Sequence, residues 1–331
     1  MDKKGSVLMI ALWIVMFLVM FALSLGNNVF LNLRLARYQR DSLKAVWLAK
    51  SGINRAVWEL EHDPNGDYDG LDESWSTGLD GSGKGIFENV KLREDCEGVF
   101  NVRYLFDKTK DKYLAVEDEE RKLNVNAAKK EQLIELFTSA GFSGDAFELS
   151  EFILKWRGST VTMEDIFKKE VLRVPEELLL VFEYFYQQKP MEKEEARAKA
   201  QELFNKIKDW VTVYGAGSTG QLNINTASYD TLAILVNAKA QGDKVKEGAV
   251  ADITDRIIKL RGEKHLTKSG DVSFDGLIDK EQSLLDDLMK AVVFKSNNFR
   301  IQSAGSFANA ARHIDVVYDR SKDKFVYWHE R

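Results

Sequence analysis

Oxygen-bearing side chains gather between Asn65 and Glu73, and their spacing is the closest that the chain comes to a chemical site. Counted from Asn65, oxygens fall at the first, third and fifth positions and a glycine at the sixth, as in the calcium loop of an EF-hand. The twelfth position is Ser76, so the bidentate glutamate of that loop is missing. The alternative, which the run of charges favours, is a solvated acidic loop. The candidate calcium ligands are Asn65, Asp67, Asp69, Asp72 and Glu73.

A second acidic run occupies residues 117–120, and we expect it to be solvated as well. The sequence holds four histidines, at positions 62, 265, 313 and 329, and no HExxH, GxSxG or glycine-rich phosphate loop accompanies them. We therefore predict that the protein is not an enzyme and that it binds no cofactor, with calcium as the one candidate ion.

Composition narrows the function classes further. The net charge of −5 and the isoelectric point near 5.6 argue against a general nucleic-acid binder. With 331 residues, of which 44% are hydrophobic, the chain is long enough for two or three packed domains. Cys96 is the only cysteine, which excludes an intramolecular disulfide and a multi-cysteine zinc site. We expect Cys96 to be a small buried side chain.

Residues 6–25 form an apolar run without a single charged side chain, and all the groups named above follow it in the chain or flank it. A helix rises about 1.5 Å per residue, so about 20 apolar residues cross the hydrocarbon core of a bilayer. A cleaved secretory signal peptide is the alternative, since Lys3 and Lys4 form a short basic leader. The apolar core of a signal peptide is usually shorter, and here the helical pattern continues beyond it.

Beyond Asn28 the pattern becomes amphipathic. Apolar residues recur at steps of three and four, with charged residues between them. The first proline is Pro64, inside a strong helix-stop sequence, so we predict one helix from Ser6 to about Glu61. The apolar stripe of its second half consists of Leu43, Val46, Trp47, Ile53, Val57 and Leu60.

Two segments in the middle of the chain repeat each other, residues 121–158 and 222–262. Each starts with Leu-Asn-x-Asn, at Leu123 and at Leu222, and each continues into an amphipathic helix. Each ends in an Arg-Gly pair, at Arg157 and at Arg261, where we expect the glycine to stop a helix. The pattern predicts one small helical unit that is used twice.

Strand-like alternation lies on both sides of this helical region. We predict strands at 99–106 and 113–116 before it, and at 299–303, 313–318 and 325–328 after it. Strands that flank helices in this way imply one antiparallel sheet with an insertion. The predicted fold class is α+β, with a long N-terminal transmembrane and amphipathic helix packed on that sheet and two helix-hairpin-helix-like modules in the insertion.

The N-terminus resembles the processing signal of the type IV pilin and pseudopilin superfamily, because a short basic leader and Gly5 precede an apolar helix that becomes amphipathic. The resemblance implies cleavage after Gly5 by a prepilin peptidase, which leaves a methylated Ser6 as the first residue. Ile10 stands where most pilins have a glutamate. That departure, the tandem repeats and the C-terminal strands resemble the K-type minor pseudopilin family of type II secretion.

The resemblance divides the chain into a leader (1–5), a transmembrane part (6–28) and an amphipathic part (29–62) of one helix, a pilin-like α/β domain and an inserted helical domain. The pilin-like domain comprises 63–120 and 296–331, and the inserted domain comprises 121–295. The resemblance implies an N-terminus in the cytoplasm and a periplasmic head on the bacterial inner membrane. The basic residues around the span favour the opposite orientation, and we follow the resemblance.

The function that the resemblance implies is a structural one, in which the protein caps the tip of the periplasmic pseudopilus and supports export of folded proteins. Its expected partners are the I-type and J-type minor pseudopilins and the major pseudopilin. Nucleic acid is not an expected partner, because neither repeat contains a clean glycine-rich hairpin that would present amides to a phosphate. Two alternatives stay open: a membrane-tethered DNA-uptake protein, and a minor pilin of a type IV pilus.

Overall fold

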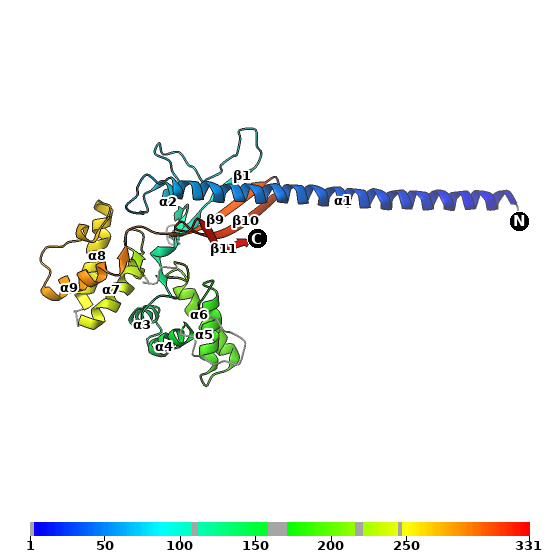
Figure 1. The fold of residues 1–331 in the computed structure, drawn as a ribbon. Coiled ribbons are helices and arrows are strands. Elements are labelled where there is room, and N and C mark those ends of the chain that lie inside the picture. The colour runs from blue at the N-terminus through cyan, green and yellow to red at the C-terminus, as the bar shows by residue number, and fades with distance from the viewer. Residues whose placement is uncertain (1–2, 108–111, 158–170, 216–220, 244–246) are drawn as a thin grey trace.

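The structure is a computed structural model, and it describes residues 3–107, 112–157, 171–215, 221–243 and 247–331. One long helix, α1 (Lys3–Glu61), projects from a head that consists of a sheet and two groups of helices (Figure 1). The sheet lies against the head-side half of α1, and the helices lie on the side of the sheet away from it. The fold is therefore α+β with a helical insertion, as the sequence predicts.

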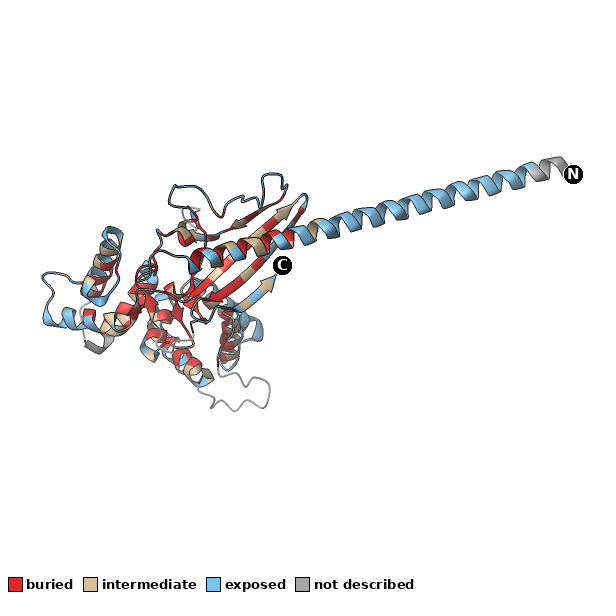
Figure 2. Cartoon of the chain, turned by 45° about the horizontal axis from the view of Figure 1, so that its top comes forward, coloured by how far each residue is buried: buried red, intermediate tan, exposed pale blue. Residues whose placement is uncertain are grey.

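Helix α1 passes through Gly26 without a break, which confirms the single helix predicted from Ser6 to Glu61. Every residue from Leu8 to Arg40 is exposed, and burial begins at Ala45 (Figure 2). From there on, residues at steps of one, three and four turn one stripe towards the sheet. The fully buried members of this stripe are Ala45, Leu48, Ala49, Ile53, Ala56 and Leu60.

The sheet under this stripe is antiparallel with the order β1-β9-β10-β11, and β4 also pairs with β9. Alternate residues of β9 and β10, among them Ile301 and Val316, contact α1, whereas Val317 faces the helices. The three predicted C-terminal strands are confirmed. The strands are β1 (Val99–Val102), β4 (Glu117–Asp118), β9 (Asn298–Phe307), β10 (Ala310–Asp319) and β11 (Lys324–Glu330).

The predicted strand at 113–116 does not join this sheet. Instead β2 (Tyr104–Asp107) and β3 (Lys112–Leu114) form a separate hairpin. The amides of Ala115 and Val116 donate to carbonyls of α2 (Ser74–Thr77), so this backbone is used by the loop that follows α1. The two residues of β4 pair with β9 instead. The predicted strand at 99–106 is also divided, into β1, which joins the sheet, and β2, which does not.

Two glycines let α1 lie directly on the sheet. A Cβ atom on Gly305 of β9 would meet the backbone of Ala45 and Ala49, and one on Gly52 of α1 would meet the hydroxyl of Ser303. No side chain fits at either contact without moving the helix. The helix and the sheet therefore form one rigid core together with Trp75 and Phe299.

Between β4 and β9 the chain builds two helical units on one plan. In each unit a two-residue strand with the Leu-Asn pair runs parallel to a two-residue strand that closes the unit. Unit 1 (residues 123–213) contains β5 (Leu123–Asn124), α3 (Lys130–Ser139), α4 (Ala146–Arg157), α5 (Glu177–Gln187), α6 (Lys193–Ile207) and β6 (Val211–Thr212). Unit 2 (residues 222–294) contains β7 (Leu222–Asn223), α7 (Tyr229–Asp243), α8 (Glu247–Glu263), η2 (Ser269–Asp271), α9 (Asp279–Met289) and β8 (Val292–Val293).

The same backbone bonds close both units. Leu123 N donates to Trp210 O at 2.8 Å, and Leu222 N donates to Ala291 O at 3.2 Å. The repeat therefore extends beyond the ranges 121–158 and 222–262 that the sequence shows, as far as β6 and β8. Gly262 does not stop a helix, since α8 runs to Glu263, and Gly158 lies outside the described residues.

Each unit has its own core, and Ile234 of α7 in unit 2 also packs into the core of unit 1. In unit 1, Leu133, Phe137 and Phe182 are fully buried, and in unit 2 the corresponding core contains Leu232 and Leu284. The core of unit 1 also includes Val317 of β10, and Tyr327 of β11 packs against it. Unit 1 is thus seated on the open face of the sheet through apolar contacts.

Candidate functional site

The longest uncovered surface of the molecule is the free half of α1. Leucine, valine, methionine and phenylalanine side chains from Leu8 to Leu35 are about half to three-quarters exposed, and one helix of this kind is long and apolar enough to cross a membrane. Large apolar side chains are also exposed at Leu43, just before burial begins, and at Trp47 and Trp58 within the half of α1 that packs on the sheet. Such a continuous apolar surface marks contact with lipid and with other proteins.

The predicted processing residues Gly5 and Ser6 lie in the first turns of α1. The leader residues Met1 and Asp2 lie outside the described part of the chain. The start of the helix at Lys3 continues into the span without a loop. The cleavage after Gly5 therefore stays a prediction from the sequence.

The loop after α1 brings three carboxylates together, and only two of them are predicted ligands. Asp63, Asp69 and Glu73 each place one oxygen within 4.8 Å of the others. The predicted Asp67 and Asp72 point elsewhere and are exposed. Asp63 is the residue that the EF-hand spacing missed, because it lies before the counted loop, next to Pro64.

Glu73 organises the acidic loop from within. Its carboxylate accepts hydrogen bonds from Asn65 Nδ2 at 2.7 Å, Gly70 N at 2.8 Å and Trp75 Nε1 at 2.9 Å. Burial raises the pKa of Glu73 to about 7, although the donors from Gly70, Asn65 and Trp75 lower it. Burial also raises the pKa of Asp63. The solvated loop that the charge pattern favours is therefore wrong for Glu73, because its carboxylate bonds to the loop itself.

Asp69 is fully buried and forms an ion pair. Both of its oxygens accept from the guanidinium of Arg320, at 3.1 and 2.7 Å, and one also accepts from Ser296 N at 2.6 Å. Arg320 follows β10, so this pair fixes the acidic loop to the end of the sheet. A bidentate arginine with a buried carboxylate is among the stronger ion pairs in proteins.

A second buried carboxylate, Asp118 of β4, joins the sheet to unit 2. One of its oxygens accepts from Thr226 Oγ1 at 2.5 Å, from Ser296 Oγ at 2.8 Å and from Asn223 Nδ2 at 3.1 Å. Burial and the neighbouring charge of Glu120 raise the pKa of Asp118 to about 7. The sequence contains no signal for this junction, because its members lie more than 100 residues apart.

The rest of the acidic run 117–120 is also paired rather than solvated. Lys122 Nζ lies 2.9 Å from Glu117 Oε1 and 3.3 Å from Glu119 Oε1, and all three side chains are largely buried. Glu120 accepts from the backbone amide of Asn297 and from the side chain of Asn298. Our expectation of a solvated run is wrong, because the strand pairing of β4 carries the run inside the head.

The two Arg-Gly arginines have the same role in their units. Arg157 donates to the carbonyls of Val125 and Ala128, at 2.6 and 2.8 Å, and Arg261 donates to those of Ile224 and Ala227, at 3.0 and 2.6 Å. Each guanidinium thus holds the Leu-Asn-x-Asn entry against the end of the second helix. Burial lowers the pKa of both arginines, and that of Arg261 falls to about 10.

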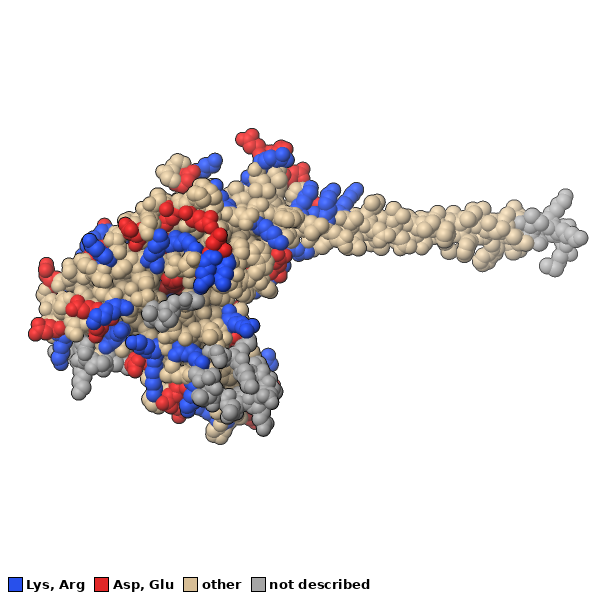
Figure 3. Space-filling model, in the orientation of Figure 1, with Lys and Arg blue, Asp and Glu red and all other residues tan. Residues whose placement is uncertain are grey.

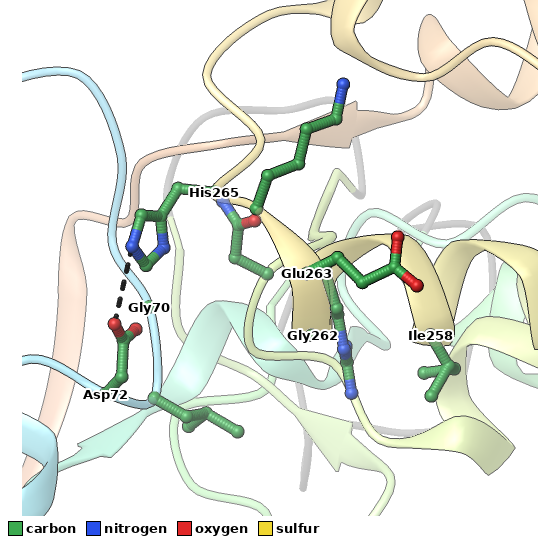
Figure 4. Close-up of a pocket in the computed structure, with 10 residues that line it drawn as sticks. Gly70, Asp72, Ile258, Gly262, Glu263 and His265 are labelled. Atoms are coloured by element: carbon green, nitrogen blue, oxygen red, sulfur yellow. Dashed lines mark ion pairs between the residues drawn. The ribbon is translucent and has the colours of Figure 1, made fainter.

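A cleft of about 610 Å³ lies between the acidic loop and unit 2 (Figure 4). His265 forms one wall, with its Nε2 atom 3.5 Å from Asp72 Oδ2 and its ring stacked on Tyr68 at 4.4 Å between centroids. Glu263 and Gly262 lie on the opposite wall (Figure 4). The lining mixes acidic, basic and apolar groups without a shared focus, so the cleft offers a contact between loop and unit rather than a catalytic arrangement.

In the hairpin between α3 and α4, three backbone amides donate to carbonyls of the chain itself and are not available to a phosphate. Gly141 N donates to Thr138 O, Phe142 N donates to Phe137 O, and Asp145 N donates to Phe142 O. The Asp145 carboxylate at its end pairs with Lys189. In unit 2 the segment Asn237–Gly242, which we considered as a hairpin, is part of α7, and residues 244–246 lie outside the described residues.

Cys96, which we expected to be buried, is only half-buried in the loop before β1.

Comparison with solved structures supports the fold. No family model and no curated protein matches the chain. Its fold matches a chain of the crystal structure of the GspK-GspI-GspJ complex from the enterotoxigenic Escherichia coli Type 2 Secretion System, with a TM-score of 0.58. The match covers 89% of this chain and 99% of the other at 15% sequence identity. The resemblance predicted from the sequence is thereby confirmed at the level of the fold.

Proposed function

We propose that this chain is a non-enzymatic minor pseudopilin of the K type, which caps the tip of the periplasmic pseudopilus of a type II secretion system. The observation that carries the proposal is the fold match over 89% of the chain, together with the long helix and tandem units that the sequence predicted. On this proposal the N-terminus is cytoplasmic and the head is periplasmic. A shared fold alone does not determine function, so the proposal also needs support from the shape of the head and from the exposed face of α1.

The width of the head supports the tip position. Units 1 and 2 extend from the side of the sheet far from α1, so the head is much wider than the helix (Figure 1). In a filament whose subunits stack through parallel α1 helices, such a head has room only where no further subunit follows above it. Ile10, in place of the usual glutamate, also removes the charge-assisted contact that a preceding subunit would otherwise use.

The partners that we propose are the I-type and J-type minor pseudopilins and the major pseudopilin, since GspK stands with GspI and GspJ in the solved complex. We expect them to cover the exposed face of α1 just outside the span, at Leu43 and Trp47, which are 61% and 67% exposed. These residues lie four apart, on one side of the helix. Apolar side chains at the centre of an interface carry most of its affinity.

The first test replaces this contact. Leu43→Glu with Trp47→Glu is expected to abolish co-purification with the I-type and J-type partners and to stop secretion. A matched control is Leu180→Glu with Ile278→Glu, at two side chains of the head that are 54% and 62% exposed. Normal secretion by the Leu43/Trp47 variant, or equal loss in the control, contradicts the proposal.

The second test concerns processing. On this proposal a prepilin peptidase cuts after Gly5, and mass spectrometry of the mature protein finds an N-methylated Ser6. A start at Met1, or a cut within Ala22–Ser24 as in a secretory signal peptide, contradicts it. In the latter case the span would be absent from the mature chain.

The calcium hypothesis now concerns a different set of oxygens. The candidate cluster is Asp63, Asp69 and Glu73, and Asp69 already has a cationic partner in Arg320. Three carboxylates within 4.8 Å favour a shared proton or a cation, since like charges repel at that distance. The test is the melting temperature of the purified chain with calcium and with a chelator. Glu73→Gln is expected to abolish any difference between the two.

The proposed division of the chain keeps the predicted boundaries: pilin-like residues 63–120 and 296–331, and an inserted domain of residues 121–295. It is supported by the core between α1 and the sheet, which contains no residue of 121–295, although Val317 of β10 also packs into the core of unit 1. Limited proteolysis that releases the insertion as one fragment would test it.

A further inference from the structure

Four basic side chains lie on one face of α1 where the apolar rod reaches the head: Arg34, Arg37, Arg40 and Lys44, here called the neck cluster. Their spacing of three, three and four residues keeps them within one side of a helix. All four are exposed, and Figure 3 shows basic side chains gathered at the end of the uncharged rod. Such a cluster contradicts the usual distribution of charge around a span, and the proposed function does not use it.

The neck cluster needs an anion from outside the chain. Asp41 is the only acidic residue between Gly5 and Lys44, and it pairs with Arg40 at 2.8 Å. Arg34 lies over the ring of Phe30, and Lys44 lies over the ring of Phe307. Within the described part of the chain Arg37 has no acidic partner. Like charges at steps of three and four destabilise a helix, so an external anion would stabilise this one.

The length of α1 places Arg34 and Arg37, the first two members of the neck cluster, at the surface of a bilayer. Gly5–Leu33 contains 29 residues without a charge. At about 1.5 Å per residue it measures about 43 Å, which equals the full thickness of a bilayer with its headgroups, about 40 to 45 Å. When the span is in place, Arg34 and Arg37 therefore reach the phosphate layer on the side of the head. Phe30 and Tyr38, which are about half exposed, flank them as interfacial aromatic residues do.

We propose that the neck cluster binds the phosphate groups of anionic phospholipids in the leaflet beneath the head, and so fixes the depth of α1 in the membrane. A guanidinium matches a phosphate with two parallel hydrogen bonds, which favours the three arginines for this role. The inference rests on insertion of α1 in a bilayer and not on the tip-capping function. It holds for either orientation of the chain, since the cluster lies on the side of the head in both.

Lipid is favoured over an acidic protein surface because the chain itself holds the neck cluster at the bilayer. The span that ends at Leu33 is covalently continuous with Arg34, so the local concentration of headgroups is high before any partner arrives. Burial on the head begins only at Ala45, so the head leaves the three arginines open, and only Lys44 contacts it, over Phe307. A sister subunit remains an alternative occupant, and the experiment separates the two.

The experiment uses the full chain, which is reconstituted in mixed vesicles of phosphatidylcholine and phosphatidylglycerol, extracted gently, and analysed for retained lipid by native mass spectrometry. We expect retained phosphatidylglycerol to exceed its share in the vesicle and to fall as salt rises. Each basic residue near a lipid surface favours the anionic lipid about fivefold. In the variant R34Q/R37Q/R40Q/K44Q the enrichment of phosphatidylglycerol should therefore be at least about tenfold lower.

Two controls decide the interpretation. The variant R93Q/R173Q/R197Q/K208Q removes the same residue types and the same charge from exposed positions of the head, and it should retain the preference. The variant R34K/R37K/R40K keeps the charge and should keep most of the preference. If the neck variant inserts normally but retains phosphatidylglycerol as the parent chain does, the proposal is wrong. Equal loss in the head variant would also overturn it.

The outcome does not depend on secretion. If the neck variant keeps lipid but fails to co-purify with other pseudopilins, the occupant is a protein and the lipid proposal is wrong. If the neck variant loses lipid while Leu43→Glu with Trp47→Glu still secretes normally, the lipid proposal stands and the pseudopilin proposal falls. Should the neck variant fail to insert, Arg37→Gln alone gives the same test, with an expected loss of about fivefold.

Discussion

Units 1 and 2 begin with the same four-residue pattern, yet its first asparagine faces different neighbours in the two units. In unit 1, Asn124 Nδ2 donates to the carbonyls of Tyr214 and Gly215, which directly follow the unit's own closing strand. In unit 2, the equivalent Asn223 Nδ2 lies 2.7 Å from Ser296 Oγ and 3.1 Å from Asp118 Oδ2, and it also donates to Asp69 O. One asparagine closes its own unit, and the other bonds to the loops that join its unit to the sheet.

The second asparagine of the pattern does not differ. Asn126 accepts from Leu172 N and donates to Leu172 O and Val213 O, and Asn225 accepts from Leu266 N and donates to Leu266 O and Phe294 O. In both units it joins the entry to the segment after the second helix and to the closing strand. The comparison teaches that a repeated pattern fixes the interior of a unit, whereas its attachment depends on the surroundings.

The two attachments are also chemically different. Unit 1 lies on the sheet through apolar contacts with Val317 and Tyr327. Unit 2 packs on unit 1 through Ile234 of α7, but its attachment to the sheet and the acidic loop is made by polar groups around two buried carboxylates, Asp69 and Asp118. Apolar contacts tolerate small changes, whereas a buried charge that loses its partner is costly. The predictions below test this difference, and all are measured by hydrogen exchange of the full chain in detergent.

The largest effect is expected from Arg320→Met. It leaves the Asp69 carboxylate buried without its bidentate partner, which costs about 3 to 5 kcal/mol of the opening free energy of amides in unit 2. Amides of unit 1 should change much less. The double variant Asp69→Asn with Arg320→Met is the control, and it should recover part of the loss because no charge remains. Equal loss in both units would show that the two attachments do not differ.

The next effect compares the two first asparagines directly. Asn223→Ala removes a donor from the buried Asp118 carboxylate and should cost about 3 kcal/mol, because hydrogen bonds to charged groups are the strong ones. Asn124→Ala leaves neutral carbonyls without a donor and should cost about 1.5 kcal/mol. Both variants also remove the acceptor of the amide two residues on, at Asn126 and at Asn225, so that loss cancels in the comparison. The exchange of α7–α9 amides reports the first and that of α3–α6 amides the second. Equal costs would mean that the charge of Asp118 does not matter.

Much of this architecture follows from local sequence signals. The apolar run and the absence of proline before Pro64 fix the helix, and period-two alternation fixes β9 to β11. The repeated Leu-Asn-x-Asn pattern reveals two units, because each unit is closed by backbone bonds to its own Leu-Asn strand. The helices α3, α4, α7 and α8 carry the visible similarity, whereas the closing strands are only the short pairs Val211–Thr212 and Val292–Val293.

The junction could not be predicted, because it depends on contacts between distant parts of the chain. Asp118 bonds to Asn223 and Ser296, which are 105 and 178 residues away. The acidic run that contains it has the composition of a solvated loop, and only strand pairing with β9 brings it inside. Asp63 was missed for a related reason. The EF-hand spacing begins at Asn65, whereas in the folded chain Asp63 lies beside Asp69 and Glu73.

A smaller effect concerns Arg157 and Arg261. Each donates to two carbonyls, so Arg157→Met should cost about 2 kcal/mol of the opening free energy of unit 1. Arg261→Met should cost less, about 1 kcal/mol, since the removal of a buried charge near Arg121 relieves a desolvation cost that lowers the pKa of Arg261 to about 10. Hydrogen exchange of the α3–α4 amides measures the cost of Arg157→Met, and that of the α7–α8 amides measures the cost of Arg261→Met. A larger cost at Arg261 would contradict the argument.

The smallest effect is a pH dependence that unit 2 has and unit 1 lacks. Burial raises the pKa of Asp118 to about 7, well above the ordinary aspartate value. The folded state therefore binds the proton more tightly, so the stability gained is complete below about pH 4 and is lost as the pH rises through about 7. Between pH 6 and 7 the opening free energy of α7–α9 amides should fall by about 1 kcal/mol.

The groups around Asn124 do not titrate, so α3–α6 amides should show no such change once exchange rates are corrected for their intrinsic pH dependence. Asp118→Asn is expected to flatten the profile of unit 2, because it removes the proton-binding group and keeps a side chain of the same shape. Glu73 also has a pKa near 7, so Glu73→Gln is the second control and should leave most of the slope. A slope that survives Asp118→Asn but disappears with Glu73→Gln would place the titration in the acidic loop. The polar attachment of unit 2 would then be insensitive to pH, and the difference between the two units would reduce to the number of their hydrogen bonds.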